Sequence, residues 1–170
     1  LMADVGRARY GLTDAAAHYG RSMAILAGDC QQAWAVALLT TLPELGIDAG
    51  VTLQLIRRLQ RLTGPAIVEG EARDIQLPFR PVATVTEDDI LHMMRTKTAA
   101  LFAYCGWAGG LLARGGEDDD VRALAAFAEQ AGIAFQLQDD VLGLVGSSQK
   151  LGKPVGNDLR EGKRTLIIAL

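Results

Sequence analysis

Apolar residues recur at helical spacing along most of this chain. They return every three or four positions over residues 13–41, 48–77, 87–112 and 117–146, with polar residues between them. No stretch alternates apolar and polar residues for long enough to indicate a strand. The pattern therefore predicts an all-α fold in which antiparallel helices form a bundle.

Local signals predict where these helices begin, bend and end. Pro65 lacks a backbone N–H group, so it should bend or split the second helix. Thr86 and Asp89 have the spacing of a capping box at the start of the third helix. Gly115 marks the end of that helix, and residues 165–170 are expected to open a further helix.

One helical stretch, FQLQDDVLGL at residues 135–144, carries polar groups in an otherwise apolar pattern. Gln136, Asp139 and Asp140 are spaced i, i+3 and i+4, so they share one face of the helix. Adjacent carboxylates on an apolar helix repel each other and lose hydration. A Mg²⁺ ion removes that cost, because it takes carboxylate oxygens and keeps several waters. Two interpretations follow: a metal site, or an exposed polar stripe at a helix end.

The segment after this helix is basic and rich in glycine. Residues 147–164 contain lysines and arginines separated by glycines, which let the backbone approach an anion closely. Carboxylates followed by such a segment are typical of a site in which Mg²⁺ bridges acid and diphosphate while lysines neutralise the remaining charge. A solvated basic loop is the alternative.

The helix at 87–112 carries a lysine within its apolar stripe. The stripe is predicted from Ile90, Met94, Leu101 and Cys105. Lys97 and Thr98 fall within it, so the lysine either has an anionic partner or extends out to solvent. Glu71 and Asp74, spaced i, i+3 on another apolar helix, form a candidate hydrogen-bonding group for the same cavity.

Composition narrows the class of protein. The 170 residues are 49% hydrophobic, which is enough for one globular domain. A formal net charge of −3 gives no overall attraction to nucleic acid or acidic lipid, so neither is expected as a partner. No run of about 18 apolar residues indicates stable membrane insertion, and a cytoplasmic protein is expected. Cys30 and Cys105 lie in apolar runs and are predicted to be buried free thiols.

Five segments of the chain resemble known motifs of one protein family. They are HYGRSMAILAGD (18–29), GEARD (70–74), KTAAL (97–101), FQLQDDVLGLVG (135–146) and GKPVGNDLREGKRT (152–165). In this order they resemble motifs of the trans-isoprenyl diphosphate synthases, also called polyprenyl synthetases, of the geranylgeranyl diphosphate synthase type. The last two look like the second aspartate-rich motif of the family and the lysine loop beyond it.

This resemblance implies a single all-α isoprenoid synthase domain over residues 1–170, with the helices arranged around a central cavity. It implies a Mg²⁺-dependent prenyltransferase that condenses isopentenyl diphosphate with an allylic prenyl diphosphate and releases pyrophosphate. A homodimer is expected from apolar helical faces such as AILAGDCQQAWAVALL at residues 24–39. An alternative is a non-catalytic partner subunit of a heteromeric prenyl diphosphate synthase. The lysines of the chain argue against that alternative, because a purely structural subunit has no reason to keep phosphate ligands.

The resemblance also assigns metal and diphosphate ligands. Asp139 would ligate Mg²⁺ on the diphosphate of the allylic substrate, with Asp140 assisting. Three lysines would hold the same diphosphate: Lys97, Lys153 and Lys163.

Further residues are assigned to the reacting part of the substrate. Thr98 and Gln136 would act with Lys97 as catalytic residues near the reacting carbons. Phe135 would contact the prenyl chain or the isopentenyl group. An apolar helical cavity would keep the carbocation formed during the reaction away from water.

The chain departs from the family pattern in two places. Gly143 stands where the second aspartate-rich motif usually closes with a third aspartate. The first aspartate-rich motif has no match, since LMAD at residues 1–4 resembles at most its tail. The last residues, TLIIAL at 165–170, stop within an apolar run. We therefore expect the chain to be incomplete at both ends.

Overall fold

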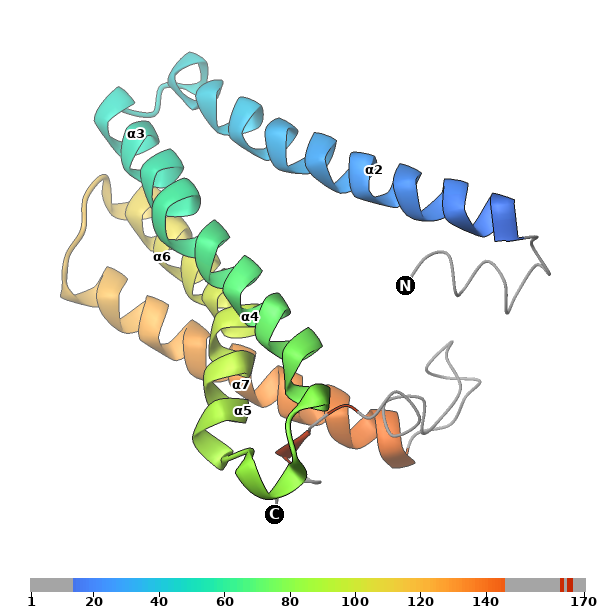
Figure 1. Cartoon of the computed structure of the whole chain (residues 1–170). Helices are drawn as coiled ribbons and strands as arrows, with labels where there is room; N and C mark the ends of the chain where they lie inside the picture. The colour runs from blue at the N-terminus through green and yellow to red at the C-terminus, as the bar shows by residue number, and fades with distance from the viewer. Residues whose placement is uncertain (1–13, 146–162, 164, 167–170) are drawn as a thin grey trace. The chain divides into compact units, whose positions relative to one another are not determined.

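The computed structural model describes residues 14–145, 163 and 165–166, and in this part of the chain every regular element is a helix (Figure 1). The all-α prediction is therefore confirmed. The chain forms two compact units, Leu1–Thr52 and Leu53–Leu170. The single isoprenoid synthase domain expected over the whole chain stays a prediction.

The first unit consists mainly of α2 (Asp14–Thr40), which is one continuous helix in Figure 1. A 3-10 turn, Leu42–Leu45, follows it. α3 (Ala49–Arg58) begins after Asp48, whose side chain accepts hydrogen bonds from two backbone N–H groups of the first turn. An aspartate in this position satisfies backbone donors that the helix itself leaves without partners.

The second unit contains the rest of α3 and all later elements. In chain order these are the π-turn η2 (Leu59–Thr63), α4 (Gly64–Gln76), the 3-10 turns η3 (Leu77–Phe79) and η4 (Val82–Thr84), α5 (Glu87–Met94), the π-turn η5 (Arg95–Ala99), α6 (Ala100–Arg114) and α7 (Asp119–Val145). α6 and α7 pack along each other as an antiparallel pair (Figure 1). The π-turn η5 contacts both α4 and α7, so it lies between them.

Buried apolar side chains hold the second unit together. The largest fully buried ones are Leu55, Ile90, Met94, Leu111 and Val121. One cluster consists of Leu77, Val85, Ile90, Met93 and Met94, with Leu137 and Leu166 packed against it. Because this cluster includes the last residues before η5, close packing there fixes the position from which the turn begins.

The apolar stripe predicted for residues 87–112 is correct in its first half and wrong in its second. Ile90 and Met94 are buried, whereas Leu101 is 46% exposed and Cys105 is also exposed. The cause is η5, because a π-turn adds one residue to the helix and so rotates everything after it by roughly 100°. The buried positions after the turn are Tyr104, Trp107 and Leu111.

Two expectations drawn from composition can be compared with the structure. Cys30 and Cys105 are free thiols, but both are exposed, so the prediction that they are buried is wrong. Cys105 lies on the rotated part of the α5–α6 segment, and Cys30 lies on α2, where most described side chains are exposed. Within the described residues, no helix combines the length and apolar character that crossing a membrane requires.

Two of the predicted helix signals in the second unit are confirmed, and the split expected at Pro65 is not found. Thr86 Oγ1 accepts a hydrogen bond from the N–H of Asp89 at 3.1 Å, and the Asp89 carboxylate accepts one from the N–H of Thr86 at 3.0 Å. Gly115 ends α6 in the left-handed conformation with φ of 71°. Pro65 does not split the second helix, because the π-turn η2 joins α3 directly to the first turn of α4, which contains this proline.

The capping box makes the stability of α5 depend on pH. The pKa of Asp89 is lowered from 3.8 to about 2, first by the backbone N–H of Thr86 and then by the side chains of Arg80 and Thr86. A lowered pKa means that the ionised carboxylate stabilises the fold above pH 3.8, and that this contribution is lost as pH falls toward 2. Asp89→Asn should therefore weaken the pH dependence of unfolding in that range.

Urea unfolding of the unaltered protein and of the Asp89→Asn variant between pH 5 and pH 2 tests this expectation. Asp88→Asn is the matched control, because the neighbouring Asp88 carboxylate is not part of the capping box. If both variants changed the pH dependence equally, the capping box would not be its source.

Candidate active site

The site is organised around the π-turn η5, which presents Lys97 and Thr98 in succession. Single π-turns inside α-helices frequently occur at functional sites. Two glycines let this wide turn approach its neighbours. A Cβ atom on Gly70 of α4 would lie 2.2 Å from the backbone nitrogen of Lys97, and one on Gly132 of α7 would lie 2.7 Å from the Cα of Ala99. The turn therefore fits only between helices that carry glycine at these points.

Lys97 forms ion pairs with two acids of α4. Its Nζ lies 2.5 Å from Asp74 Oδ2 and 3.1 Å from Glu71 Oε2. Burial alone lowers the pKa of Lys97, but the hydrogen bond and the charge of Asp74, together with those of Glu71, offset this and raise the pKa above its ordinary value. Lys97 is thus positively charged at neutral pH. Of the two interpretations of this lysine, the one with an anionic partner is confirmed.

A chain of hydrogen bonds connects η5 to α7. Thr98 Oγ1 donates to Gln136 Oε1 at 2.7 Å, and Gln136 Nε2 donates to Asp140 Oδ1 at 3.0 Å. The amide of Gln136 therefore fixes the hydroxyl on one side and the carboxylate on the other. Three of the predicted site residues form this one connected group.

A small cavity brings most of the predicted residues together. It is lined by Asp74, Met93, Lys97, Gln136, Asp140, Lys163 and Thr165. Its volume is about 30 Å³, which is the share of roughly one water molecule in the liquid. A diphosphate could therefore enter only after some of these side chains move apart.

Two lining residues were not identified from the sequence. Met93 closes one side of the cavity from α5, and nothing in its local sequence distinguishes it from a core residue. Thr165 is 5% exposed, and its hydroxyl has no hydrogen-bond partner among the described residues. It directly follows the basic segment and is the last residue of the motif at 152–165, so its position was a signal that could have found it. A buried hydroxyl without a partner, beside two lysines, suits a site that receives an anionic ligand.

The remaining predicted residues have different surroundings. Asp139 is half-buried next to Asp140 on α7. Phe135 is 55% exposed, and its ring centroid lies 5.5 Å from that of Phe102. Lys153 lies outside the described residues. Among the residues that are described, no group of three or more His, Cys, Asp or Glu side chains could hold a metal ion by itself.

Comparison with known proteins gives consistent matches over nearly the whole chain. The sequence profile of the polyprenyl synthetase family matches residues 2–170. A geranylgeranyl diphosphate synthase of Sulfolobus acidocaldarius is 38% identical over 165 residues, which are 97% of this chain and 48% of that protein. A farnesyl diphosphate synthase of Geobacillus stearothermophilus is 37% identical over 148 residues, covering 86% of this chain and 48% of that protein.

A solved structure matches in the same way. The geranylgeranyl pyrophosphate synthase of Corynebacterium glutamicum, crystallised with isoprenyl diphosphate and magnesium, superimposes with a TM-score of 0.76 at 34% identity. The match covers 99% of this chain and 45% of that one. The chain therefore spans about half the length of the relatives that it matches.

Proposed function

The chain belongs to the polyprenyl synthetase family, and we propose that it acts as a Mg²⁺-dependent prenyltransferase of the geranylgeranyl diphosphate synthase type. In the proposed reaction, the C–O bond of an allylic diphosphate breaks and its electron pair leaves on pyrophosphate. The double bond of isopentenyl diphosphate then forms a carbon–carbon bond to the allylic cation, and loss of a proton gives the longer prenyl diphosphate. The observation that carries this proposal is the single cavity that Lys97, Lys163, Gln136 and Asp140 line together.

The lysines of this cavity suit the departing pyrophosphate. Lys97 is 26% exposed at its side chain, and Lys163 is half-buried. Ammonium groups in such a partly desolvated place interact with developing negative charge more strongly than they would in water. We propose that both hold the diphosphate of the allylic substrate, and that Lys153 contributes a third ammonium group from the segment outside the described residues.

The acids at this end of α7 fit a divalent cation that arrives with its ligand. Asp139 and Asp140 offer two adjacent, half-buried carboxylates. Such a donor set suits Mg²⁺, which binds through one or two carboxylates and substrate phosphates and keeps several waters. When bound, the ion would stabilise the negative charge that develops on pyrophosphate.

Three further residues face the organic part of the substrate in this proposal. The hydroxyl of Thr98 and the amide of Gln136 are fixed to each other at 2.7 Å, so together they present a rigid polar edge beside the reacting carbons. Phe135 is exposed enough to contact a prenyl chain or the isopentenyl group. Its neighbour Phe102 supports the ring from the side.

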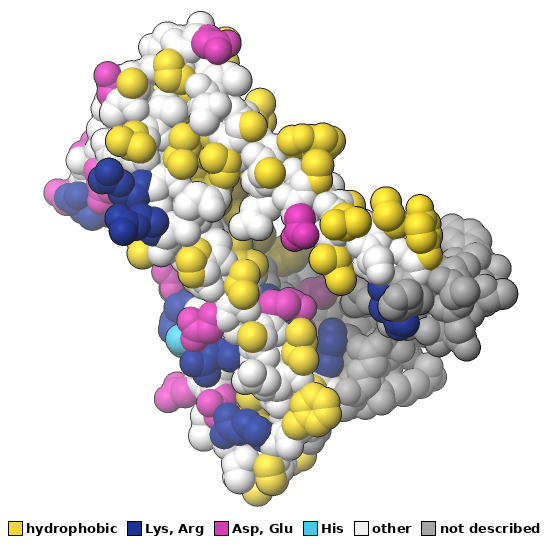
Figure 2. All heavy atoms as spheres, turned by 45° about the horizontal axis from the view of Figure 1, so that its top comes forward, with side chains coloured by type: hydrophobic (Ala, Val, Ile, Leu, Met, Phe, Trp, Pro, Cys, Tyr) yellow, Lys and Arg dark blue, Asp and Glu magenta, His cyan; other side chains and the backbone are white. Residues whose placement is uncertain are grey.

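We also propose that the protein is a cytoplasmic homodimer. The support for a dimer comes from α2, along which hydrophobic side chains are exposed (Figure 2). The large ones are Tyr19, Met23, Ile25, Leu26, Trp34 and Leu38. Exposed apolar surface of this extent on one helix is typical of a protein interface.

The test of the proposed function is a product assay on the full chain with isopentenyl diphosphate, allylic diphosphates of several lengths and Mg²⁺. We expect longer prenyl diphosphates and pyrophosphate. Asp139→Ala should raise the Mg²⁺ concentration needed for half-maximal turnover at least tenfold. Asp119→Ala is the matched control, because Asp119 lies at the other end of α7 with its side chain 98% exposed. Absence of turnover in a folded protein, or equal Mg²⁺ dependence in both variants, would contradict the assignment.

A further inference from the structure

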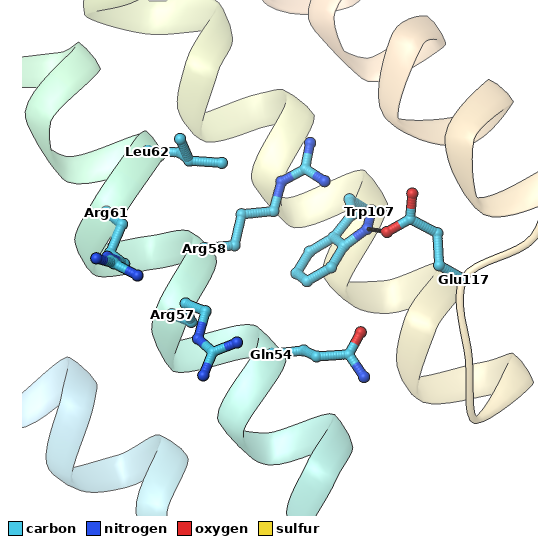
Figure 3. Close-up of a pocket in the computed structure, with 7 residues that line it drawn as sticks. All are labelled: Gln54, Arg57, Arg58, Arg61, Leu62, Trp107 and Glu117. Atoms are coloured by element: carbon cyan, nitrogen blue, oxygen red, sulfur yellow. Dashed lines mark hydrogen bonds between the residues drawn. The ribbon is translucent and has the colours of Figure 1, made fainter.

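We propose a second anion-binding site, in a pocket between α3 and α6, that takes a small molecule bearing a diphosphate group. The pocket has a volume of about 510 Å³. It is lined by Gln54, Arg57, Arg58, Arg61, Leu62, Trp107 and Glu117 (Figure 3). None of these residues belongs to the cavity around Lys97, so this inference is independent of the proposed function.

The pocket carries positive charge that the described residues do not neutralise. Arg57 and Arg61 are exposed, and neither has an ion pair with an acid of the described part of the chain. This is a local excess, since the whole chain has a formal net charge of −3. Three arginines within five positions of one helical segment repel one another, and an anion bound between them would relieve that repulsion.

The acidic residue of the pocket is engaged elsewhere. Glu117 Oε2 accepts a hydrogen bond from Trp107 Nε1 at 3.0 Å, and its other oxygen lies 3.6 Å from Arg122. In Figure 3 the Glu117 carboxylate lies beyond the indole, on the side away from Arg57 and Arg61. It therefore fixes the tryptophan and does not cancel the charge of these two arginines.

The tryptophan makes the pocket a preformed structure. Trp107 is 3% exposed, and the guanidinium carbon of Arg58 lies 4.4 Å from the centre of its ring. A cation–π contact of this kind holds the guanidinium beside the ring, and arginine has five N–H donors, so some stay available to a ligand. Arg58 is thus held in place before any ligand binds, which lowers the entropic cost of binding.

The chemistry of the lining indicates the class of ligand. Guanidinium groups bind phosphate through paired N–H···O bonds, and the Gln54 amide adds a further donor. The volume lies within the range of roughly 300–1,000 Å³ that is usual for small-molecule sites, and exceeds what one phosphate needs. Leu62 supplies apolar surface beside the arginines. A diphosphate, alone or attached to an organic group, therefore suits the pocket.

Calorimetric titration of the full chain tests this inference without turnover. The titration uses Lys97→Gln protein in EDTA, so that the Mg²⁺-dependent site does not contribute. We expect inorganic pyrophosphate to bind, and adding Arg57→Gln with Arg61→Gln to weaken binding roughly tenfold or more. The matched control adds Arg73→Gln with Arg114→Gln, which removes the same number of arginine charges outside the pocket, and should leave the affinity unchanged.

A second ligand identifies the source of the diphosphate. Geranyl diphosphate binding at least tenfold more tightly than pyrophosphate assigns the pocket to prenyl diphosphates, and equal affinities assign it to inorganic pyrophosphate. Circular dichroism confirms that each variant is folded. Absence of binding by either ligand, or unchanged affinity in the Arg57→Gln, Arg61→Gln protein, would overturn the inference. Absence of prenyl-transfer activity would not overturn it, because the titration measures binding and not turnover.

Discussion

Replacing Lys97 with glutamine is expected to lower kcat by roughly a thousandfold. The ammonium group lies in a cavity where its side chain is only 26% exposed, so in the proposed reaction its attraction for the departing pyrophosphate would be poorly screened by water. Glutamine keeps most of the side-chain length but carries no charge. The variant would also leave Asp74 and Glu71 without the cation that now pairs with both. Two negative groups would then face an incoming diphosphate.

These two effects can be separated, because they act on different steps. Loss of the ammonium group is expected to lower kcat, whereas repulsion by Asp74 and Glu71, left without their cation, is expected to raise the KM for the allylic substrate. The double variant Lys97→Gln, Asp74→Asn should recover part of the KM and little of kcat. Steady-state kinetics on the two single variants and the double variant measure the difference. Lys97→Arg, which keeps the charge, should lose much less activity than Lys97→Gln.

One result would contradict this role of Lys97. If Lys97→Gln kept more than a tenth of the original kcat, the lysine would not stabilise the leaving group. Its ion pairs with Asp74 and Glu71 would then serve only to hold η5 against α4. In that case both Lys97→Gln and Asp74→Asn should lower the free energy of unfolding without changing kcat, and urea unfolding of the same proteins would show it.

Helix ends could be predicted from the sequence because each depends on residues close together in the chain. The capping box of Thr86 and Asp89 and the helix end at Gly115 are both local, and both are confirmed. The apolar face after residue 99 could not be predicted. It depends on the π-turn η5, and no local signal shows that this helix gains a residue there.

The contacts of the candidate site that lie within one helix could be predicted from the sequence, and those between distant segments could not. Gln136 and Asp140 share a face because they are four residues apart, and the structure joins them by a hydrogen bond. Asp74, the hydrogen-bond partner of Lys97, is 23 residues away in the chain, so spacing could not predict the contact. The only sequence signal was that Asp74 and Glu71 form a polar pair on an apolar helix. The arginine pocket was not predicted, because Trp107 reaches Arg58 only through the packing of α6 against α3.

The position of Lys97 depends on a single glycine in α4. Gly70 lies against the backbone of η5, and a Cβ atom there would meet the Lys97 nitrogen at 2.2 Å and its Cα at 2.5 Å. These are main-chain atoms, so no flexible side chain can move aside to make room. The ion pair of Lys97 with Asp74, four residues along α4 from Gly70, requires that α4 and η5 stay this close.

Gly70→Ala is therefore expected to lower the free energy of unfolding by about 3 kcal/mol or more, and to reduce kcat by displacing Lys97. Gly109→Ala is the matched control within α6, because a Cβ atom at Gly109 meets nothing within 4 Å. There the better helix propensity of alanine should raise stability by about 0.5–1 kcal/mol. Urea unfolding and prenyl-transfer kinetics on both variants measure the difference. Equal stability of the two would mean that α4 and η5 can separate without cost, and that the close approach at Gly70 does not position the lysine.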